Sequence, residues 1–181
     1  MRRRDFTWLL PLIILSTAGL ACGQPSFPVQ TLPVPVTEAP PIETESPAIP
    51  PGAEVADVIG VIDGDTIDVR IDGVEYRVRY IGINTPERDE ACYEEASAAN
   101  AALVERQQLI LVRDTSETDQ YGRLLRYVYA GDLFVNAELV AEGWAEARRY
   151  PPDTYYADYL NELEQDARAG NLGCWPSGVF N

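Results

Sequence analysis

The stretch VIDGDTIDVRIDG, residues 61–73, decides how the folded part of this chain begins. Aliphatic residues alternate with aspartates on both sides of Asp63-Gly64-Asp65. Such alternation is typical of strands with one buried face, and it predicts strands over 55–62 and 66–71. Carboxylates next to a core are costly unless they face water, accept hydrogen bonds or hold a cation. The aspartates therefore need an explanation beyond the fold.

The same patterns predict the rest of the folded part. Asp72-Gly73 is a strong signal for a two-residue hairpin loop. The expected strands are 55–62, 66–71, 76–83, 109–112 and 124–129, and the expected helices are 90–107, 135–142 and 155–169. This order predicts an α+β, mainly β fold for residues 54–181: a small five-stranded OB-fold barrel with about three helices packed on it.

The N-terminal part resembles an export signal followed by a spacer. Basic residues precede an apolar run too short for a membrane span, which predicts a signal peptide over 1–22. Arg3-Arg4 resembles a twin-arginine motif, although an ordinary basic start explains it equally well. Cys22 lies where a lipoprotein signal is cut, so we expect it to be lipidated. Residues 23–53 are rich in proline and predict a disordered tether, or a stub without a role. The protein is thus expected outside the cytoplasm, as a lipoprotein on the outer face of the membrane or secreted.

The amino-acid composition limits which catalytic groups this chain can use. The chain has no histidine, which excludes Ser-His-Asp and Cys-His triads and histidine-based zinc sites. Catalysis would have to use carboxylates, arginines, tyrosines or a hard cation. The formal net charge of −15 by itself argues against nucleic acid as a partner.

Two cysteines remain if Cys22 carries a lipid. In an oxidising compartment such a pair, Cys92 and Cys174, predicts a disulfide. A structural role is expected, because a nucleophilic cysteine needs a partner base that the chain lacks.

Three clusters of polar residues carry possible chemistry. They are Asp63-Gly64-Asp65-Thr66, RVRYIGINTPE (77–87) and TDQYGRLLRYVY (118–129). Each alone is as typical of a turn or loop as of a site. Taken together, their order and spacing resemble those of the staphylococcal nuclease (thermonuclease) family. The resemblance continues through VNAELVAEGWA (135–145) to NLGCW (171–175), and so covers essentially the whole folded part.

The resemblance implies a Ca²⁺-dependent phosphodiesterase acting on DNA or RNA, with 3′-phosphate products. It places Asp65 and Asn84 at two calcium-ligand positions and gives Thr85 a ligating backbone carbonyl. Asp63 is expected either beside these ligands or as a turn former. Asn84 departs from the aspartate usual in the family, so calcium binding should be weak and Asn84→Asp should strengthen it.

The resemblance also assigns the remaining roles. Arg79 and Arg123 would hold the phosphate, and Glu87 would act as general base or orient the attacking water. This chemistry is reasonable by itself: arginine forks match phosphate oxygens, a hard cation neutralises charge, and a carboxylate can accept a proton from water.

Several residues admit two interpretations. Tyr121 resembles a tyrosine near the substrate phosphate, or it packs in the core; Tyr150 stacks on a base, or it lies in a solvated loop. Gln120 replaces a lysine that often assists phosphate binding. The acidic charge and Asn84 keep open an alternative, a non-catalytic OB-fold binding module at the cell surface, or an adhesin-like protein that binds calcium structurally. A monomer is expected, touching the membrane only through its lipid anchor.

Overall fold

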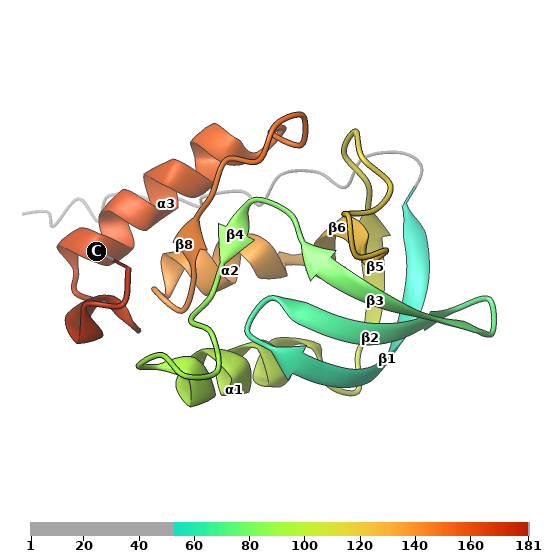
Figure 1. The fold of residues 1–181 in the computed structure, drawn as a ribbon, viewed down its shortest axis with the longest axis horizontal. Helices are drawn as coiled ribbons and strands as arrows, with labels where there is room; N and C mark the ends of the chain where they lie inside the picture. The colour runs from blue at the N-terminus through green and yellow to red at the C-terminus, as the bar shows by residue number, and fades with distance from the viewer. Residues whose placement is uncertain (1–52, 181) are drawn as a thin grey trace, which may run out of the picture. The chain divides into compact units, whose positions relative to one another are not determined.

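The folded part begins with an antiparallel meander of three strands. The computed structural model describes residues 53–180, in which β1 (Glu54–Asp63), β2 (Thr66–Ile71) and β3 (Val74–Tyr80) are neighbours in one sheet (Figure 1). The loop between β2 and β3 is the predicted two-residue turn, with φ of 49° at Asp72 and 84° at Gly73. Positive φ at both positions matches the twist of a hairpin.

Two later strands close this meander into a barrel. β5 (Gln108–Val112) pairs with β1, and β6 (Leu124–Ala130) pairs antiparallel with β5 and parallel with β3. The short β7 (Leu133–Phe134) pairs antiparallel with the end of β6. The predicted five-stranded OB-fold barrel is confirmed.

The third strand is shorter than the sequence predicts. It ends at Tyr80, and Gly82 has a φ of 80°, which turns the chain out of the barrel. β4 (Ile83–Asn84) then pairs with β8 (Glu146–Ala147) in a separate two-stranded sheet. This second sheet lies at the candidate site.

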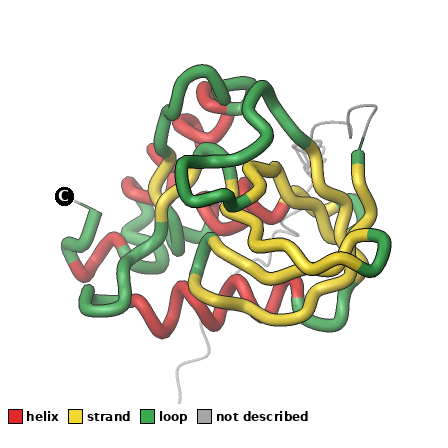
Figure 2. Tube along the Cα trace, turned by 45° about the vertical axis from the view of Figure 1, so that its right-hand side comes forward, coloured by secondary structure: helices red, strands yellow, loops and turns green. Residues whose placement is uncertain are grey.

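Three α-helices pack against the barrel, as predicted. They are α1 (Tyr93–Val104), α2 (Val135–Ala141) and α3 (Ala157–Ala169), and a 3₁₀ turn, η1 (Trp175–Ser177), follows. In Figure 1, α1 lies below β1 and β2 while α3 runs beside β8; in Figure 2, the strands gather to one side of the helices. Alternate strand residues such as Ile67 and Val69 meet Leu160 of α3 and Val104 of α1 in one core.

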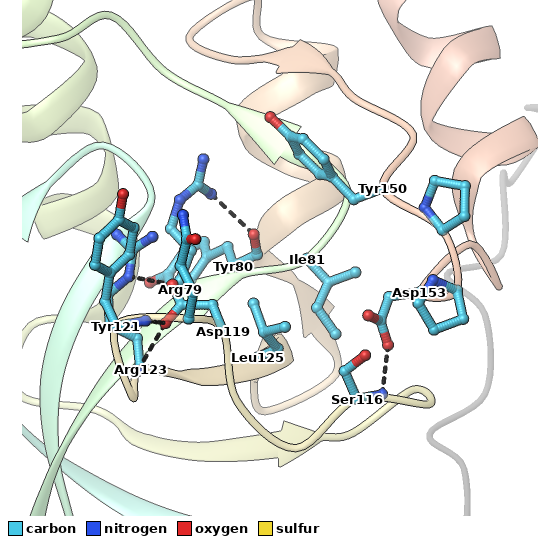
Figure 3. A pocket seen from close by; sticks show the side chains of 13 residues that line it. Arg79, Tyr80, Ile81, Ser116, Asp119, Tyr121, Arg123, Leu125, Tyr150 and Asp153 are labelled. Carbon is cyan, nitrogen blue, oxygen red and sulfur yellow. Dashed lines mark hydrogen bonds and ion pairs between the residues drawn. The ribbon is translucent and has the colours of Figure 1, made fainter.

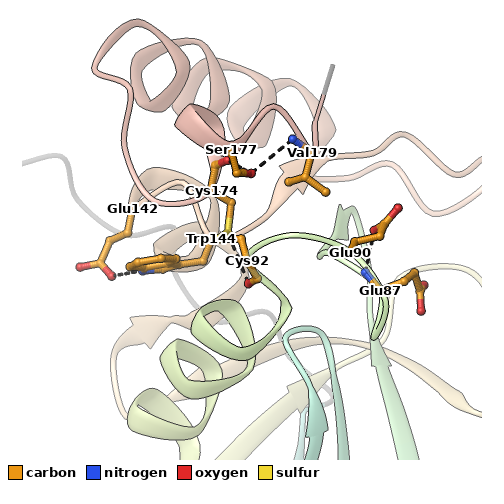
Figure 4. The surroundings of a disulfide bond; sticks show 8 residues. All are labelled: Glu87, Glu90, Cys92, Glu142, Trp144, Cys174, Ser177 and Val179. Atoms are coloured by element: carbon orange, nitrogen blue, oxygen red, sulfur yellow. Dashed lines mark hydrogen bonds between the residues drawn. A yellow bond between two sulfur atoms is a disulfide. The ribbon is translucent and has the colours of Figure 1, made fainter.

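A disulfide joins α1 to the C-terminal segment. Cys92 precedes the first residue of α1, and its sulfur is 2.05 Å from that of Cys174 (Figure 4). The segment docks closely, because a Cβ on Gly143 would lie 2.5 Å from the Leu172 carbonyl oxygen. Only glycine allows this approach, which brings Cys174 to α1.

The expected signal peptide, the lipidation at Cys22 and nearly all of the proline-rich tether lie outside the described residues. Within residues 53–180, no helix is both long and apolar enough to span a membrane.

Candidate functional site

The turn between β1 and β2 buries a carboxylate. Asp65 is 5% exposed, and its Oδ2 accepts the backbone N–H of Thr85 at 2.9 Å while the Thr66 hydroxyl donates to Oδ1 at 3.1 Å. The Asp63 carboxylate accepts the backbone N–H of Asp65 at 3.1 Å. Asp63 is therefore a turn former in this structure, one of the two roles expected for it.

Buried polar groups hold the turn in place from behind. The Nδ2 of Asn100, on α1, donates to the Asp63 carbonyl at 2.8 Å, and its Oδ1 accepts the Tyr80 hydroxyl at 2.9 Å. A Cβ on Gly64 would lie 2.7 Å from the Thr85 side chain, so glycine allows the turn to approach the loop after β4. The position of Asp65 is thus determined by three segments.

Arg79, near the end of β3, is the partner of this carboxylate. Its Nη2 lies 3.0 Å from Asp65 Oδ2, and its Nη1 donates to the carbonyls of Tyr80 at 2.9 Å and Ile83 at 3.0 Å. Nη2 also donates to Asn84 Oδ1 at 3.3 Å. With a side chain only 13% exposed, Arg79 is fixed by acceptors on most sides.

Burial dominates the electrostatics of Asp65. It raises the pKa of the carboxyl from 3.8 to about 6, and the positive charge of Arg79 only partly opposes this effect. The carboxylate form is therefore incompletely compensated by the protein itself. A group of this kind gains from a further positive charge nearby.

Asn84, on β4, has a second charged neighbour that no sequence motif indicates. Its Nδ2 donates to Glu146 Oε1 at 3.1 Å, and the same oxygen lies 2.8 Å from Arg148 Nη2. Glu146 is 8% exposed. In the sequence, Glu146 is a single acidic residue between Ala145 and Ala147, and nothing else there indicates its contact with Asn84.

The Tyr-Gly turn before β6 presents the second arginine. Asp119 accepts the backbone N–H groups of Tyr121 and Arg123 and, at 2.6 Å, the Nε of Arg123. Burial acts to raise the pKa of Asp119, but these hydrogen bonds hold it below its ordinary value. The guanidinium carbon of Arg123 lies 5.6 Å from the centre of the Tyr121 ring. Asp119 thus satisfies turn amides and orients the arginine at the same time.

Both arginines line one pocket of about 400 Å³. Tyr121 and Tyr150 stand on either side of Arg79 at this pocket (Figure 3). The pocket lining includes Asp153, whose buried Oδ1 accepts the N–H groups of Thr115 and Ser116 at 2.9 and 2.7 Å. Asp153 thus holds a distant loop against the pocket, a role that no short motif around it indicates.

The two tyrosines are surface residues. Tyr121 is 75% exposed, so the alternative of a packing tyrosine is wrong. Tyr150 is 50% exposed and lines the pocket, which leaves its ring accessible to a ligand.

Glu87 does not line the pocket. It lies in the exposed loop between β4 and α1, where its backbone N–H donates to Glu90 Oε2 at 2.7 Å (Figure 4). Its carboxylate has no bonded partner among residues 53–180. The structure therefore brings Asp65, Arg79 and Asn84 together. Arg123 lines the same pocket as Arg79, whereas Glu87, like Asp65 and Asn84, is not among the residues that line it.

The remaining aspartates of the opening stretch have ordinary roles. Asp68 forms a two-pronged pair with Arg77 at 2.8 and 3.0 Å, and Asp72 occupies the hairpin turn. Among these four aspartates, Asp65 alone combines burial with a raised pKa.

The oxygens around Asp65 suit a hard cation. Ca²⁺ prefers carboxylate, amide and backbone carbonyl oxygens, the groups that Asp65, Asn84 and Thr85 provide. Within residues 53–180, no three acidic, cysteine or histidine side chains cluster as a ready metal site. A cation here would depend on neutral oxygens and water as well.

Comparison with known proteins gives consistent matches. A family model described as staphylococcal nuclease homologue matches residues 77–177. The thermonuclease of Staphylococcus intermedius is 36% identical over 121 residues, which cover 64% of this chain and 72% of that protein. The endonuclease YncB of Bacillus subtilis is 40% identical over 127 residues, 66% of this chain and 60% of that protein. The micrococcal nuclease of Shigella flexneri is 36% identical over 131 residues, 66% of this chain and 72% of that protein.

Proposed function

This chain belongs to the staphylococcal nuclease family, and from that premise we propose that it is a nuclease that hydrolyses phosphodiester bonds of DNA or RNA. We further propose that the reaction depends on Ca²⁺, leaves 3′-phosphate ends and takes place outside the cytoplasm. The observation that carries the proposal is the pair of arginines, Arg79 and Arg123, on one pocket beside the buried Asp65.

The arginines bind the scissile phosphate. Attack on a phosphodiester increases the negative charge on its non-bridging oxygens, and guanidinium N–H groups donate charge-assisted hydrogen bonds to such oxygens. Arg79 is already oriented by the Tyr80 and Ile83 carbonyls, and Arg123 by Asp119. Groups that are held before the substrate arrives need little reorganisation in the transition state.

Asp65, Asn84 and Thr85 are the residues that would hold the cation. A bound Ca²⁺ would supply positive charge next to the phosphate and a site for water. The fit rests on Asp65, whose carboxylate is buried and incompletely compensated by Arg79. The amide oxygen of Asn84 and a carboxylate oxygen of Asp65 both lie close to Nη2 of Arg79.

Glu87 is assigned to the attacking water. A carboxylate can orient water or accept its proton, provided that it comes within hydrogen-bond reach of the reacting atoms. Its loop is exposed, and its side chain is not engaged by the described residues, so substrate binding can draw it toward the phosphate.

Tyr121 and Tyr150 extend the substrate site. Exposed aromatic rings on either side of a phosphate pocket can stack on nucleotide bases without selecting a sequence. This contact also helps to offset the unfavourable negative charge of the chain.

The test is digestion of plasmid DNA and of RNA with added Ca²⁺ or with a chelator, followed by end-group analysis. We expect calcium-dependent cleavage with 3′-phosphate and 5′-hydroxyl ends, and loss of cleavage in Arg123→Ala. Cleavage that persists in chelator would contradict calcium dependence. No cleavage under any condition, together with retained oligonucleotide binding, would instead indicate the non-catalytic OB-fold module.

We also propose that residues 1–22 direct export and that Cys22 carries a lipid anchor, with residues 23–53 as the tether. Metabolic labelling with a radioactive fatty acid, compared between the full chain and Cys22→Ser, tests this. Labelling that is equal in both proteins would contradict the anchor.

A further inference from the structure

The amide of Asn84 lies between a donor and an acceptor of opposite charge. Arg79 Nη2 is 3.3 Å from its Oδ1, and Glu146 Oε1 is 3.1 Å from its Nδ2. The reverse orientation would place two donors together and two acceptors together. The neighbours therefore fix which end of the amide faces Arg79 and Asp65.

The backbone makes the contact with Glu146 a built feature of the fold. β4 and β8 pair so that Asn84 and Glu146 are direct partners (Figure 1). Just after Glu146, the backbone N–H of Ala147 donates to Glu164 Oε1 at 2.9 Å, and that of Arg148, the first residue after β8, donates to the Gly82 carbonyl at 2.8 Å. Glu146 is buried, so its carboxylate has little freedom to turn away.

Arg148 supplies the counter-charge of Glu146. Its Nε and Nη2 lie 2.9 and 2.8 Å from Glu146 Oε1, the oxygen that also accepts from Asn84. Hydrogen bonds from a guanidinium group to a carboxylate are among the strong ones in proteins. Residue 84 therefore faces a firmly held carboxylate oxygen, and an amide donor satisfies it.

We propose that Glu146 is a positioning residue: it holds the Asn84 amide with its carbonyl oxygen toward the cation site, and it makes asparagine rather than aspartate the residue that suits this position. The inference rests on the calcium dependence proposed above. It revises the expectation that Asn84→Asp strengthens calcium binding. An aspartate at position 84 would place two carboxylates about one hydrogen-bond length apart, and the gain in charge would be offset by their repulsion.

The test is a four-protein cycle: wild type, Asn84→Asp, Glu146→Gln and the double variant. Calcium dissociation constants are measured by isothermal titration calorimetry without substrate, so the readout does not depend on activity. We expect Asn84→Asp alone to change the constant less than twofold. In the Glu146→Gln background, the same substitution should tighten calcium binding about tenfold.

A second measurement requires no calcium. In excess chelator, Asn84→Asp should lower the melting temperature in the wild-type background, and Glu146→Gln should remove most of that loss. A purely structural carboxylate would show the opposite, with the two substitutions destabilising independently. Glu162→Gln, which removes one exposed negative charge from α3, is the matched control and should restore nothing.

The remaining outcomes are decisive in different ways. Tenfold tightening by Asn84→Asp in both backgrounds overturns the role of Glu146 but leaves the nuclease proposal intact. No tightening in either background removes Asn84 from the cation site and overturns the inference as well. If none of the four proteins binds calcium, both the inference and the proposed calcium dependence fail.

Discussion

Arg79 and Glu87 are eight positions apart in the chain, yet the structure treats them in opposite ways. The Arg79 side chain is 13% exposed and donates to Tyr80, Ile83 and Asn84 besides pairing with Asp65. Glu87 lies in an exposed loop and is not among the residues that line the pocket. The fold holds Arg79 in place, whereas Glu87 lies on the surface and is not held by the residues around it.

The difference follows from where the two residues lie. Arg79 belongs to a barrel strand, and its backbone is paired with strands on both sides. Glu87 follows the short β4 and precedes α1, in a loop anchored at its far end by Cys92. Binding groups on rigid elements are preorganised, whereas a loop can close on the substrate.

Replacing Arg79 should have the largest expected effect, because it should lower both turnover and stability. Arg79→Ala should reduce turnover by about 10³-fold, because a phosphate-binding donor is lost. It should also cost about 3 kcal/mol of stability, since Asp65 is left buried without its partner. Steady-state kinetics and urea unfolding in chelator measure the two effects.

Arg77→Ala is the matched control on the same strand. Its side chain is 50% exposed and pairs with Asp68, so the stability cost should be below about 1 kcal/mol. Equal costs in the two variants would contradict the special position of Arg79.

The disulfide that anchors the loop of Glu87 is tested by removing both cysteines. The bond joins residues 82 positions apart, and the double variant Cys92→Ser/Cys174→Ser should lose about 4 kcal/mol of unfolding free energy. Turnover should also fall, because the loop of Glu87 ends at Cys92. Urea unfolding with and without reductant measures the effect in the wild type. A loss below about 1 kcal/mol would show that packing alone holds the C-terminal segment.

Glu87→Gln isolates the exposed side. Turnover should fall by about 10² or more, equivalent to about 2.7 kcal/mol of transition-state stabilisation, if the carboxylate acts on water. Stability should stay within about 0.5 kcal/mol of the wild type, because the side chain is exposed. Asp89→Asn, in the same exposed loop, should change neither quantity. Unchanged turnover in Glu87→Gln would remove this residue from the mechanism.

The smallest expected effect is the pH dependence of stability that Asp65 contributes. The folded protein holds the Asp65 proton more tightly than the unfolded chain, with a pKa of about 6 against 3.8. In chelator, this group should therefore lower stability by about 1–2 kcal/mol as the pH rises from about 4 to 6. Other carboxylates, such as Asp119, have lowered pKa values and act in the opposite direction at lower pH.

The Asp65 contribution is obtained as the difference between wild type and Asp65→Asn across that range. We expect the variant to gain relative stability as the pH rises, while it loses calcium binding. Parallel pH profiles for the two proteins would show that Arg79 fully compensates the buried charge.

The strand periodicity, the Asp72-Gly73 hairpin and the order of the expected strands and helices are sufficient by themselves to predict the barrel. These signals are local, because each depends on residues within one element or one turn. The candidate residues Asp65, Arg79, Asn84 and Arg123 come instead from the resemblance to a known family that three short motifs carry together. Their catalytic and metal-binding roles stay predictions.

Only the tertiary structure decided how these groups act on one another. Asn84 meets Glu146 across 62 positions of sequence, and Asn100 reaches the Asp63 carbonyl from a different element. Such contacts depend on how β4 pairs with β8 and how α1 packs, which no short motif encodes. The amino-acid sequence alone determined which polar residues the motifs supply to the pocket. Burial decided that Arg79 only partly compensates the charge of Asp65. Long-range pairing decided that Asn84 contacts the carboxylate of Glu146, and the path of the chain left Glu87 out of the pocket lining.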